Sequence, residues 1–280
     1  SAVEDGFINL GQWLATGRFF ETEECDAHTH GRNFKSGFPL IGDVPVIKDI
    51  LNVANLNPVY DESIEHCNQH GITDLGVYLV NRMIDKNMLI ELDHMSNYTA
   101  TATMDIVEAR NYSGVITSHS WMQDAKNGEV HNNVKRLIEV GGFSTPYNVN
   151  ASGITDRISR YLDIVEQTPY LNGVGFGTDM SGLGGQAGPR DDTNINPLDY
   201  PYTSEFGFVF DKQVSGNRVF DLNQDGIAHY GLVADHLQDI REQAPQRIYE
   251  SVMNSAEAYL QMWERAETST NTTHFDPLAE

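Results

Sequence analysis

Short apolar runs alternate with stretches of helical spacing along the chain from residue 71 onward. Runs of about four to six apolar residues, bounded by polar ones, suit strands that are buried on both faces of a parallel sheet. They predict strands at 88–93, 114–118, 143–149 and 173–178. Helical spacing predicts helices near 73–84, 98–110, 130–140, 156–166, 228–242 and 245–267. This alternation of strands and helices indicates an α/β fold.

The helix that begins at Thr73 shows the pattern most clearly. Thr73 is a suitable N-cap, and an apolar stripe follows at Leu75, Leu79, Val80, Met83 and Ile84. Gly141 follows the helix near 130–140, where a glycine commonly ends a helix.

The pattern divides the chain into segments of different character. Residues 1–70 contain Gly, Pro and Asn at short intervals and predict an irregular loop segment. Residues 71–267 carry the α/β pattern, interrupted at 181–226 by an insertion that we interpret as a lid or a surface excursion. Residues 268–280 read as a polar, frayed tail.

Three of the predicted strands end on residues with acid–base or metal-binding side chains. His94 and His119 follow successive strands, and Asp179 follows a later one. In a β/α barrel, side chains at the carboxyl ends of the strands face the reaction centre. We therefore expect metal or catalytic chemistry at this end, although a single histidine at a strand end is commonly a hydrogen-bonded structural residue.

Charge and cysteine content narrow the class of protein. The net charge is −22, from 18 basic and 40 acidic residues, which argues against nucleic acid or an anionic membrane as a partner. No stretch of about 18 apolar residues occurs, so no membrane span is expected.

The first residues lack a signal peptide and suggest a mature or cleaved end. We expect a secreted or periplasmic protein in which Cys25 and Cys67 form a disulfide, with two free thiols as the alternative.

Several motifs together resemble the membrane dipeptidase (renal dipeptidase) family of the amidohydrolase superfamily. They are Gly71-Ile-Thr-Asp-Leu-Gly76, Val80-Asn-Arg-Met83, Met88-Leu-Ile-Glu-Leu-Asp-His94-Met-Ser96, Val115-Ile-Thr-Ser-His119-Ser120 and Val174-Gly-Phe-Gly-Thr-Asp179. The resemblance implies a (β/α)8 barrel with two zinc ions, in which His94 and His119 ligate one zinc. It also implies that Asp179 handles the proton of the attacking water.

The resemblance covers only the C-terminal part of such a barrel, about strands 5 to 8. The family's first-strand His-x-Asp pair and its bridging glutamate have no convincing counterpart. We therefore expect a second chain, or a cleaved N-terminal fragment, to complete the barrel. His28 and His30 resemble the superfamily's His-x-His pair, but we place them in a loop near Cys25 and keep a metal role for them as an alternative.

Other residues are candidates for the neighbourhood of the site. The family's arginine that holds the dipeptide carboxylate would fall near His131, where no arginine occurs. His229 and Tyr230 follow the insertion and are possible substrate neighbours, or His229 simply caps a helix. Asp221, Asn223 and Asp225 copy the first half of an EF-hand, but Leu232 stands where a bidentate glutamate is required. A turn is therefore favoured over a calcium site.

These observations lead to one main hypothesis about function and two alternatives. The first is a dipeptidase-like zinc hydrolase that cleaves an amide or peptide bond in a small substrate once its barrel is completed. The alternative is a non-catalytic structural or assembly protein that keeps the barrel scaffold. A complete site within this one chain, using His28 and His30, is a third possibility.

Overall fold

The computed structural model describes residues 2–26, 29, 31–32, 44–53, 58, 60–120, 128–147, 150–180, 186–189 and 196–269. The chain forms two compact units. The first comprises residues 1–77, 95–103 and 123–131, and the second comprises residues 78–94, 104–122 and 132–280.

The described residues form helices and short strands. The helices are α1 (Ala2–Thr16), α2 (Pro45–Val53), α3 (Asp74–Asp85), α4 (Asn97–Ala109), α5 (Asn132–Glu139), α6 (Ala151–Val165), α7 (Leu222–Asp225), the 3₁₀ helix η1 (Tyr230–Leu232), α8 (Val233–Gln243), α9 (Gln246–Met253) and α10 (Ser255–Thr268). The strands are β1 (Thr22–Glu24), β2 (His66–Asn68), β3 (Ile90–Glu91), β4 (Val115–Ser120), β5 (Phe143–Pro146), β6 (Tyr202–Thr203), β7 (Val209–Phe210), β8 (Gln213–Ser215) and β9 (Arg218–Phe220). No helix in these ranges is long and apolar enough to cross a membrane.

A parallel sheet in the order β3-β4-β5 is the centre of the second unit. The predicted fourth strand runs beside β5, where the Gly175 and Gly177 amides donate to the carbonyls of Ser144 and Pro146 at 3.3 and 3.2 Å. Only a single parallel bridge, Tyr147 to Gly177, forms along this segment. The predicted α/β class with parallel strands is therefore confirmed.

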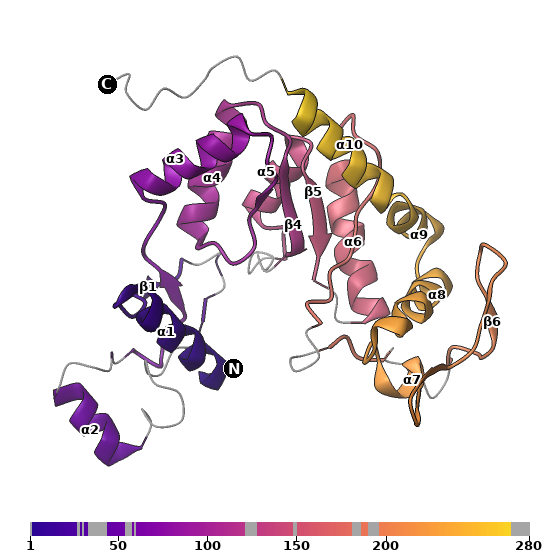
Figure 1. Ribbon diagram of the computed structural model, residues 1–280, viewed down its shortest axis with the longest axis horizontal. Coiled ribbons are helices and arrows are strands. Elements are labelled where there is room, and N and C mark those ends of the chain that lie inside the picture. Colours follow the sequence, from indigo (N-terminus) through magenta and orange to yellow (C-terminus); the bar gives the residue numbers. More distant parts are fainter. Residues whose placement is uncertain are drawn as a thin grey trace. The chain divides into compact units, whose positions relative to one another are not determined.

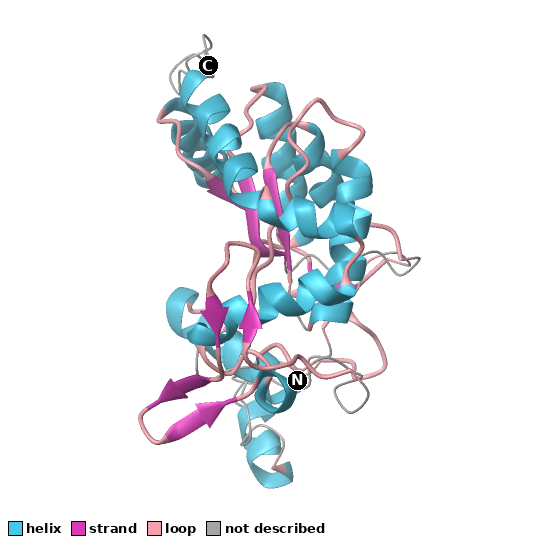
Figure 2. Cartoon of the chain, turned by 90° about the vertical axis from the view of Figure 1, so that its right-hand side faces the viewer, coloured by secondary structure: helices cyan, strands magenta, loops and turns pink. Residues whose placement is uncertain are grey.

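Helices cover this sheet because each strand is followed by a segment with an apolar face. Helices α5, α6 and α10 pack against β5, while α8 and α9 pack against α6 (Figure 1). Figure 2 shows the parallel strands surrounded by these helices. Fully buried side chains from both strands and helices form the core, among them Ile90, Leu92, Met104, Leu137, Ile154, Ile158 and Leu162.

Helix α3 buries only part of its predicted stripe. Thr73 caps it as expected, since its hydroxyl oxygen accepts a hydrogen bond from the Gly76 amide at 3.1 Å. Val80 and Ile84 are buried, whereas Leu79 is 57% exposed. One apolar side of α3 therefore lacks a covering element among the described residues.

The C-terminal helices differ from the prediction. The helix expected at 228–242 begins only at Val233, because the His229 side chain caps the separate 3₁₀ turn η1. The helix expected at 245–267 is divided into α9 and α10 at Asn254, whose amide side chain donates to the Asn172 carbonyl at 3.3 Å.

The prediction of an irregular segment at residues 1–70 is wrong for α1, α2, β1 and β2. Polar contacts hold this unit, which is why apolar spacing does not reveal it. Buried Asn9 of α1 donates to the Tyr60 hydroxyl at 2.7 Å and accepts from the Phe20 amide at 2.8 Å. The predicted disulfide is confirmed, because Cys25 and Cys67 are bonded across the antiparallel pair β1–β2.

The insertion at 181–226 is more regular than expected over its described part. It forms the antiparallel pairs β6–β7 and β8–β9 and the short helix α7. It also has its own apolar cluster, composed of Ala187, Leu198, Tyr202, Phe220, Leu222, Ile227 and Leu232. This cluster packs against Met180, the residue after Asp179.

An ion pair with little solvent exposure ties the end of α3 to the residue after α4. The Asp85 carboxylate accepts from Arg110 at 2.7 Å, and their side chains are 4% and 9% exposed. Asp85→Asn should lower the free energy of unfolding by about 3 kcal/mol at pH 7, because it leaves a buried guanidinium without its charged partner. Burial alone would raise the pKa of Asp85, but the hydrogen bonds and charges of Arg110 and Arg82 outweigh it and lower that pKa.

The stabilisation from Asp85 is therefore present above the unfolded-state pKa and is lost as the pH falls through the lower folded-state value. Urea unfolding at a series of pH values measures both effects. Asp156→Asn is the matched control, since the carboxylate that pairs with Arg160 is 73% exposed and its loss should cost less than about 0.5 kcal/mol. Equal losses in the two variants would contradict the prediction.

Candidate functional site

The two predicted histidines meet at the carboxyl ends of adjacent parallel strands. His94 follows β3 and His119 lies near the end of β4. Their Nε2 atoms are 2.9 Å apart, and their ring centroids are 5.0 Å apart. His94 is exposed and His119 is half-buried, so the pair is open to solvent on one side.

An irregularity in β4 directs His119 towards His94. Thr117 pairs with Ser144 and Ser120 pairs with Pro146, so two residues of β4 oppose the single residue Thr145 of β5. Such a bulge leaves backbone amides without strand partners and changes the direction of a side chain. His119 is one of the two bulged residues.

Asp93 supplies the missing partners of the bulge. Its Oδ2 atom accepts hydrogen bonds from the backbone amides of Ser118 and His119, at 2.8 and 2.9 Å. The same oxygen is 3.3 Å from His119 Nδ1, and the Asp93 side chain is fully buried. The carboxylate thus holds the backbone of His119 and lies beside its ring. The Ser118 hydroxyl is hydrogen-bonded to Nδ1 of that ring at 2.9 Å, and the ring's other nitrogen faces His94.

A second carboxyl group lies beside Asp93. Glu91 Oε1 accepts from the amides of Asp93 and Ser118, each at 3.2 Å. Burial, and next the charge of Asp93, raise the pKa of Glu91 to about 7. One acid of this pair is therefore held near its titration point at neutral pH.

Backbone strain marks two of the predicted site residues. His94 and Asp179 have φ angles of +66° and +50°, a region that side-chain-bearing residues seldom adopt. Both angles occur where a strand ends and the chain turns. Strain of this kind collects at functional sites, where the surrounding fold must hold it in place.

Asp179 lies at the same end of the sheet as the histidine pair. Gly177 passes so close to β4 that an added Cβ would lie 2.8 Å from the Cα of His119. Asp179 follows two residues later with an exposed side chain. That carboxylate has no side-chain hydrogen bond or ion pair to any described residue.

Of the two residues predicted near the substrate, Tyr230 contacts the backbone beside Asp179, whereas His229 makes contacts elsewhere. The Tyr230 hydroxyl donates to the Met180 carbonyl at 2.8 Å, one residue beyond Asp179. His229 stacks on Phe220 and caps η1, since its Nδ1 accepts from the Gly231 amide at 3.0 Å. The capping interpretation of His229 is therefore the one that the structure supports.

For three further candidates, a place beside the pair stays a prediction. His131 belongs to the first unit, so its role near the site stays a prediction. His28 and His30 lie outside the described residues. Within the described ranges, no group of three or more His, Cys, Asp or Glu side chains is arranged to hold a metal ion.

The EF-hand-like run has other partners. Asp221 caps α7 and pairs with Lys212 at 2.7 Å, and Asp225 pairs with Arg218 at 2.9 Å. The Asn223 amide exchanges two hydrogen bonds with the backbone of Leu198. These contacts make the run a structural turn, which was the favoured interpretation.

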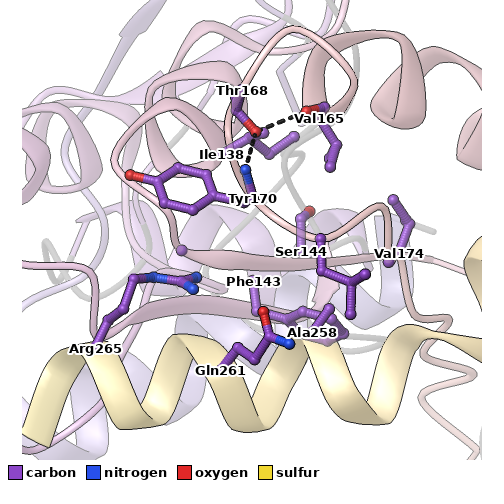
Figure 3. A pocket seen from close by; sticks show the side chains of 13 residues that line it. Ile138, Phe143, Ser144, Val165, Thr168, Tyr170, Val174, Ala258, Gln261 and Arg265 are labelled. Carbon is purple, nitrogen blue, oxygen red and sulfur yellow. Dashed lines mark hydrogen bonds between the residues drawn. The ribbon is translucent and has the colours of Figure 1, made fainter.

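A small cavity lies at the opposite, amino end of the strands (Figure 3). It is lined by Gly142, Phe143 and Val174, and by Ala258 and Arg265 of α10. Its volume is about 20 Å³, enough for one water molecule. The Arg265 guanidinium donates to the Gly141 carbonyl at 2.8 Å and lies over the Tyr170 ring, so this end of the sheet serves packing.

The described residues provide part of a zinc site. Two nitrogens bound to one tetrahedral zinc at about 2.0–2.1 Å would lie about 3.3–3.4 Å apart. The observed 2.9 Å separation of the His94 and His119 Nε2 atoms therefore fits a shared ion after a small rotation of one ring. Asp93 beside Nδ1 of His119 is the type of partner that orients a histidine ligand.

Comparison with known proteins gives only distant likenesses. No protein-family model and no curated protein matches the chain. A solved structure described as dipeptidase AC, a metallopeptidase, is similar at 11% identity and a TM-score of 0.46, over 71% of this chain and 50% of that one. An amidohydrolase from Pseudomonas aeruginosa is similar at 16% identity and a TM-score of 0.40, over 70% of this chain and 57% of that one.

Both matched structures are of the kinds that the sequence motifs resemble, and the chain spans little more than half the length of either. With TM-scores below 0.5, they do not establish the fold or the activity of this chain.

The shifted pKa of Glu91 predicts how stability depends on pH. Below the unfolded-state pKa, near 4.5, the carboxyl group is protonated in both states. Between that value and about 7 it ionises in the unfolded chain but stays protonated in the folded one, so the native protein loses stability across this interval. Glu91→Gln should therefore unfold like the native protein at pH 4 but be more stable at pH 8, by about 1 kcal/mol after allowance for solvent screening.

Thermal or urea unfolding with a chelator present measures this difference. Glu139→Gln, which removes an exposed acid paired with Lys135 at 3.9 Å, should show no such pH-dependent gain. A Glu91→Gln protein that is less stable than the native one at pH 8 would show that the ionised carboxylate is needed there.

Proposed function

We propose that this chain is part of a metal-dependent hydrolase that cleaves an amide or peptide bond in a small substrate. The observation that supports it most is the convergence of the His94 and His119 Nε2 atoms at 2.9 Å. Imidazole is a preferred zinc ligand, and zinc held in an open site activates water as a nucleophile at neutral pH.

Each residue of the site has a distinct role in this proposal. His94 and His119 hold the metal, and Asp93 positions His119 by accepting from its backbone amide. Asp179 accepts the proton of the attacking water and returns it to the leaving amine, a role that suits an exposed carboxylate with no side-chain partner among the described residues. Tyr230 fixes the backbone beside Asp179 through the Met180 carbonyl.

The substrate class is kept broad because a carboxylate-binding arginine is missing near His131. The nearest arginine on α5, Arg136, already pairs with Asp105 and Glu108 at 2.6 and 2.7 Å. A small amide substrate is therefore proposed without the requirement of a free C-terminal carboxylate.

We further propose that a second chain, or a cleaved N-terminal fragment, completes the barrel and the binuclear metal site. Among the described strands, β3 pairs on one side only, with β4. Open edges of parallel sheets are normally covered. Leu79 of α3 and Met88 just before β3 are 57% and 49% exposed, which supports a covering element there.

Zinc binding tests the proposed metal site. Protein purified without chelator or denaturant should contain zinc, and His94→Ala or His119→Ala should weaken zinc binding by more than about tenfold, since each removes one ligand. Competition with a zinc-binding dye measures this. His70→Ala, which removes an exposed histidine paired with Glu21, is the control and should leave zinc affinity unchanged.

Substitution of Asp179 tests the proposed reaction separately from metal binding. Asp179→Asn should keep zinc but lower the rate of amide hydrolysis by the completed enzyme about 10²- to 10⁴-fold. Zinc content that is indifferent to both histidine substitutions would favour the alternative, a non-catalytic scaffold.

The proposed partner can be tested on the exposed side of α3. Native mass spectrometry of the protein from its natural source should show a complex with a second polypeptide. Leu79→Lys should weaken that complex, because it places a charge in the proposed interface. Leu260→Lys on α10 is the matched control, since Leu260 is 54% exposed. A single polypeptide from the natural source that hydrolyses amides without a second chain would contradict the partner proposal.

A further inference from the structure

A cleft of about 420 Å³ lies in the first unit. The end of α1, the segment at 18–21 and the segment at 68–73 form its walls. Its lining includes Gln12, Thr16, Arg18, Phe19, Asn68 and His70. The volume falls within the range of small-molecule sites, about 300–1,000 Å³.

Arg18 differs from the arginines that form ion pairs. Carboxylates pair with Arg82, Arg110, Arg136, Arg160, Arg218 and Arg247. The Arg18 guanidinium has no hydrogen bond or ion pair to any residue that the structure describes. Within the described part of the chain, it also lacks the carbonyl or amide oxygens that Arg157, Arg241 and Arg265 bind.

The chain holds the backbone of Arg18 firmly at the edge of the cleft. Helix α1 ends at Gly17, whose φ of +73° turns the chain out of the helix. The Thr16 hydroxyl donates to the Arg18 carbonyl at 3.2 Å, and its oxygen lies 3.3 Å from the Arg18 amide. Two residues later the Phe20 amide is bound by the buried Asn9 side chain. The guanidinium is thus presented from a fixed point.

Among the described residues, the one acid that lines the cleft already has partners. Glu21 Oε2 accepts from the Gln69 amide at 3.0 Å and lies 3.2 Å from His70 Nε2. The wall that carries these residues is held by the Gln69–Glu21 backbone hydrogen bond and by the nearby disulfide. Glu21 therefore offers less competition for Arg18 than a free carboxylate would.

An aromatic surface lies next to the cation. Phe19, which directly follows Arg18, stacks on Trp13 with ring centroids 5.8 Å apart and planes 16° apart. Phe20 also lines the cleft. A guanidinium beside an aromatic wall suits a ligand that combines a carboxylate with a flat or apolar group, because the two parts are recognised by charge and by stacking.

We propose that this cleft binds a small carboxylate with an aromatic or apolar group, with Arg18 as the carboxylate-binding residue. The C-terminus of a short peptide has this chemistry. The proposal is independent of the metal site and of the proposed hydrolase activity.

Binding of N-acetyl-L-phenylalanine to the full chain tests it. Isothermal titration calorimetry at low salt should detect binding, and Arg18→Gln should weaken it at least about tenfold, since the charge-assisted hydrogen bonds are lost. The uncharged N-acetyl-L-phenylalaninamide should bind the native protein at least tenfold more weakly. Arg160→Gln, which makes the same charge change on α6 in the second unit, should leave affinity unchanged.

A second measurement does not depend on a variant. The NMR signal of the Arg18 Nε–H group should shift when the carboxylate probe is added, and should not shift with the amide. Equal affinity for the two probes, equal affinity of the native and Arg18→Gln proteins, or no binding of the carboxylate probe would each overturn the proposal.

Discussion

One buried oxygen, Oδ2 of Asp93, determines the geometry of the candidate site. It accepts from both amides of the bulge in β4 and lies 3.3 Å from the His119 ring. A fully buried carboxylate is unfavourable unless donors surround it, and bulge amides without strand partners are unfavourable for the same reason. Each group therefore requires the other. Their mutual satisfaction holds the imidazole of His119 towards His94.

The site is assembled at a cost to the stability of the fold. Glu91 and Asp93 place two acids close together, and their repulsion disfavours ionising both. His94 and Asp179 adopt positive φ angles, which the surrounding backbone must stabilise. Features of this kind persist where function requires them, and the rest of the second unit offsets them with a well-packed core. The opposite end of the sheet shows the contrast, since its cavity holds no more than one water and its arginine serves packing.

The sequence predicted the α/β pattern of the second unit and the pairing of His94 with His119, because apolar strands and their terminal residues follow simple periodicity. It did not predict the roles of Asp93 and Glu91. Asp93 stands directly before a strand-end histidine, which is a usable signal, but only the register shift between Thr117 and Ser120 shows what it binds. Helix α1 was missed because its buried contact is the polar side chain of Asn9. The division of the last helix into α9 and α10 at Asn254 depends on the carbonyl of Asn172, which is far away in the sequence.

The central claim is that two imidazoles, aligned by a carboxylate-bound bulge, share one metal ion. A crystal structure of the zinc-soaked protein, with anomalous diffraction measured at the zinc edge, tests it most directly. The account predicts one anomalous peak within bonding distance of Nε2 of both His94 and His119, with Asp93 still bound to the amides of residues 118 and 119. A peak that contacts only one of these rings, or that lies elsewhere on the protein, would contradict it.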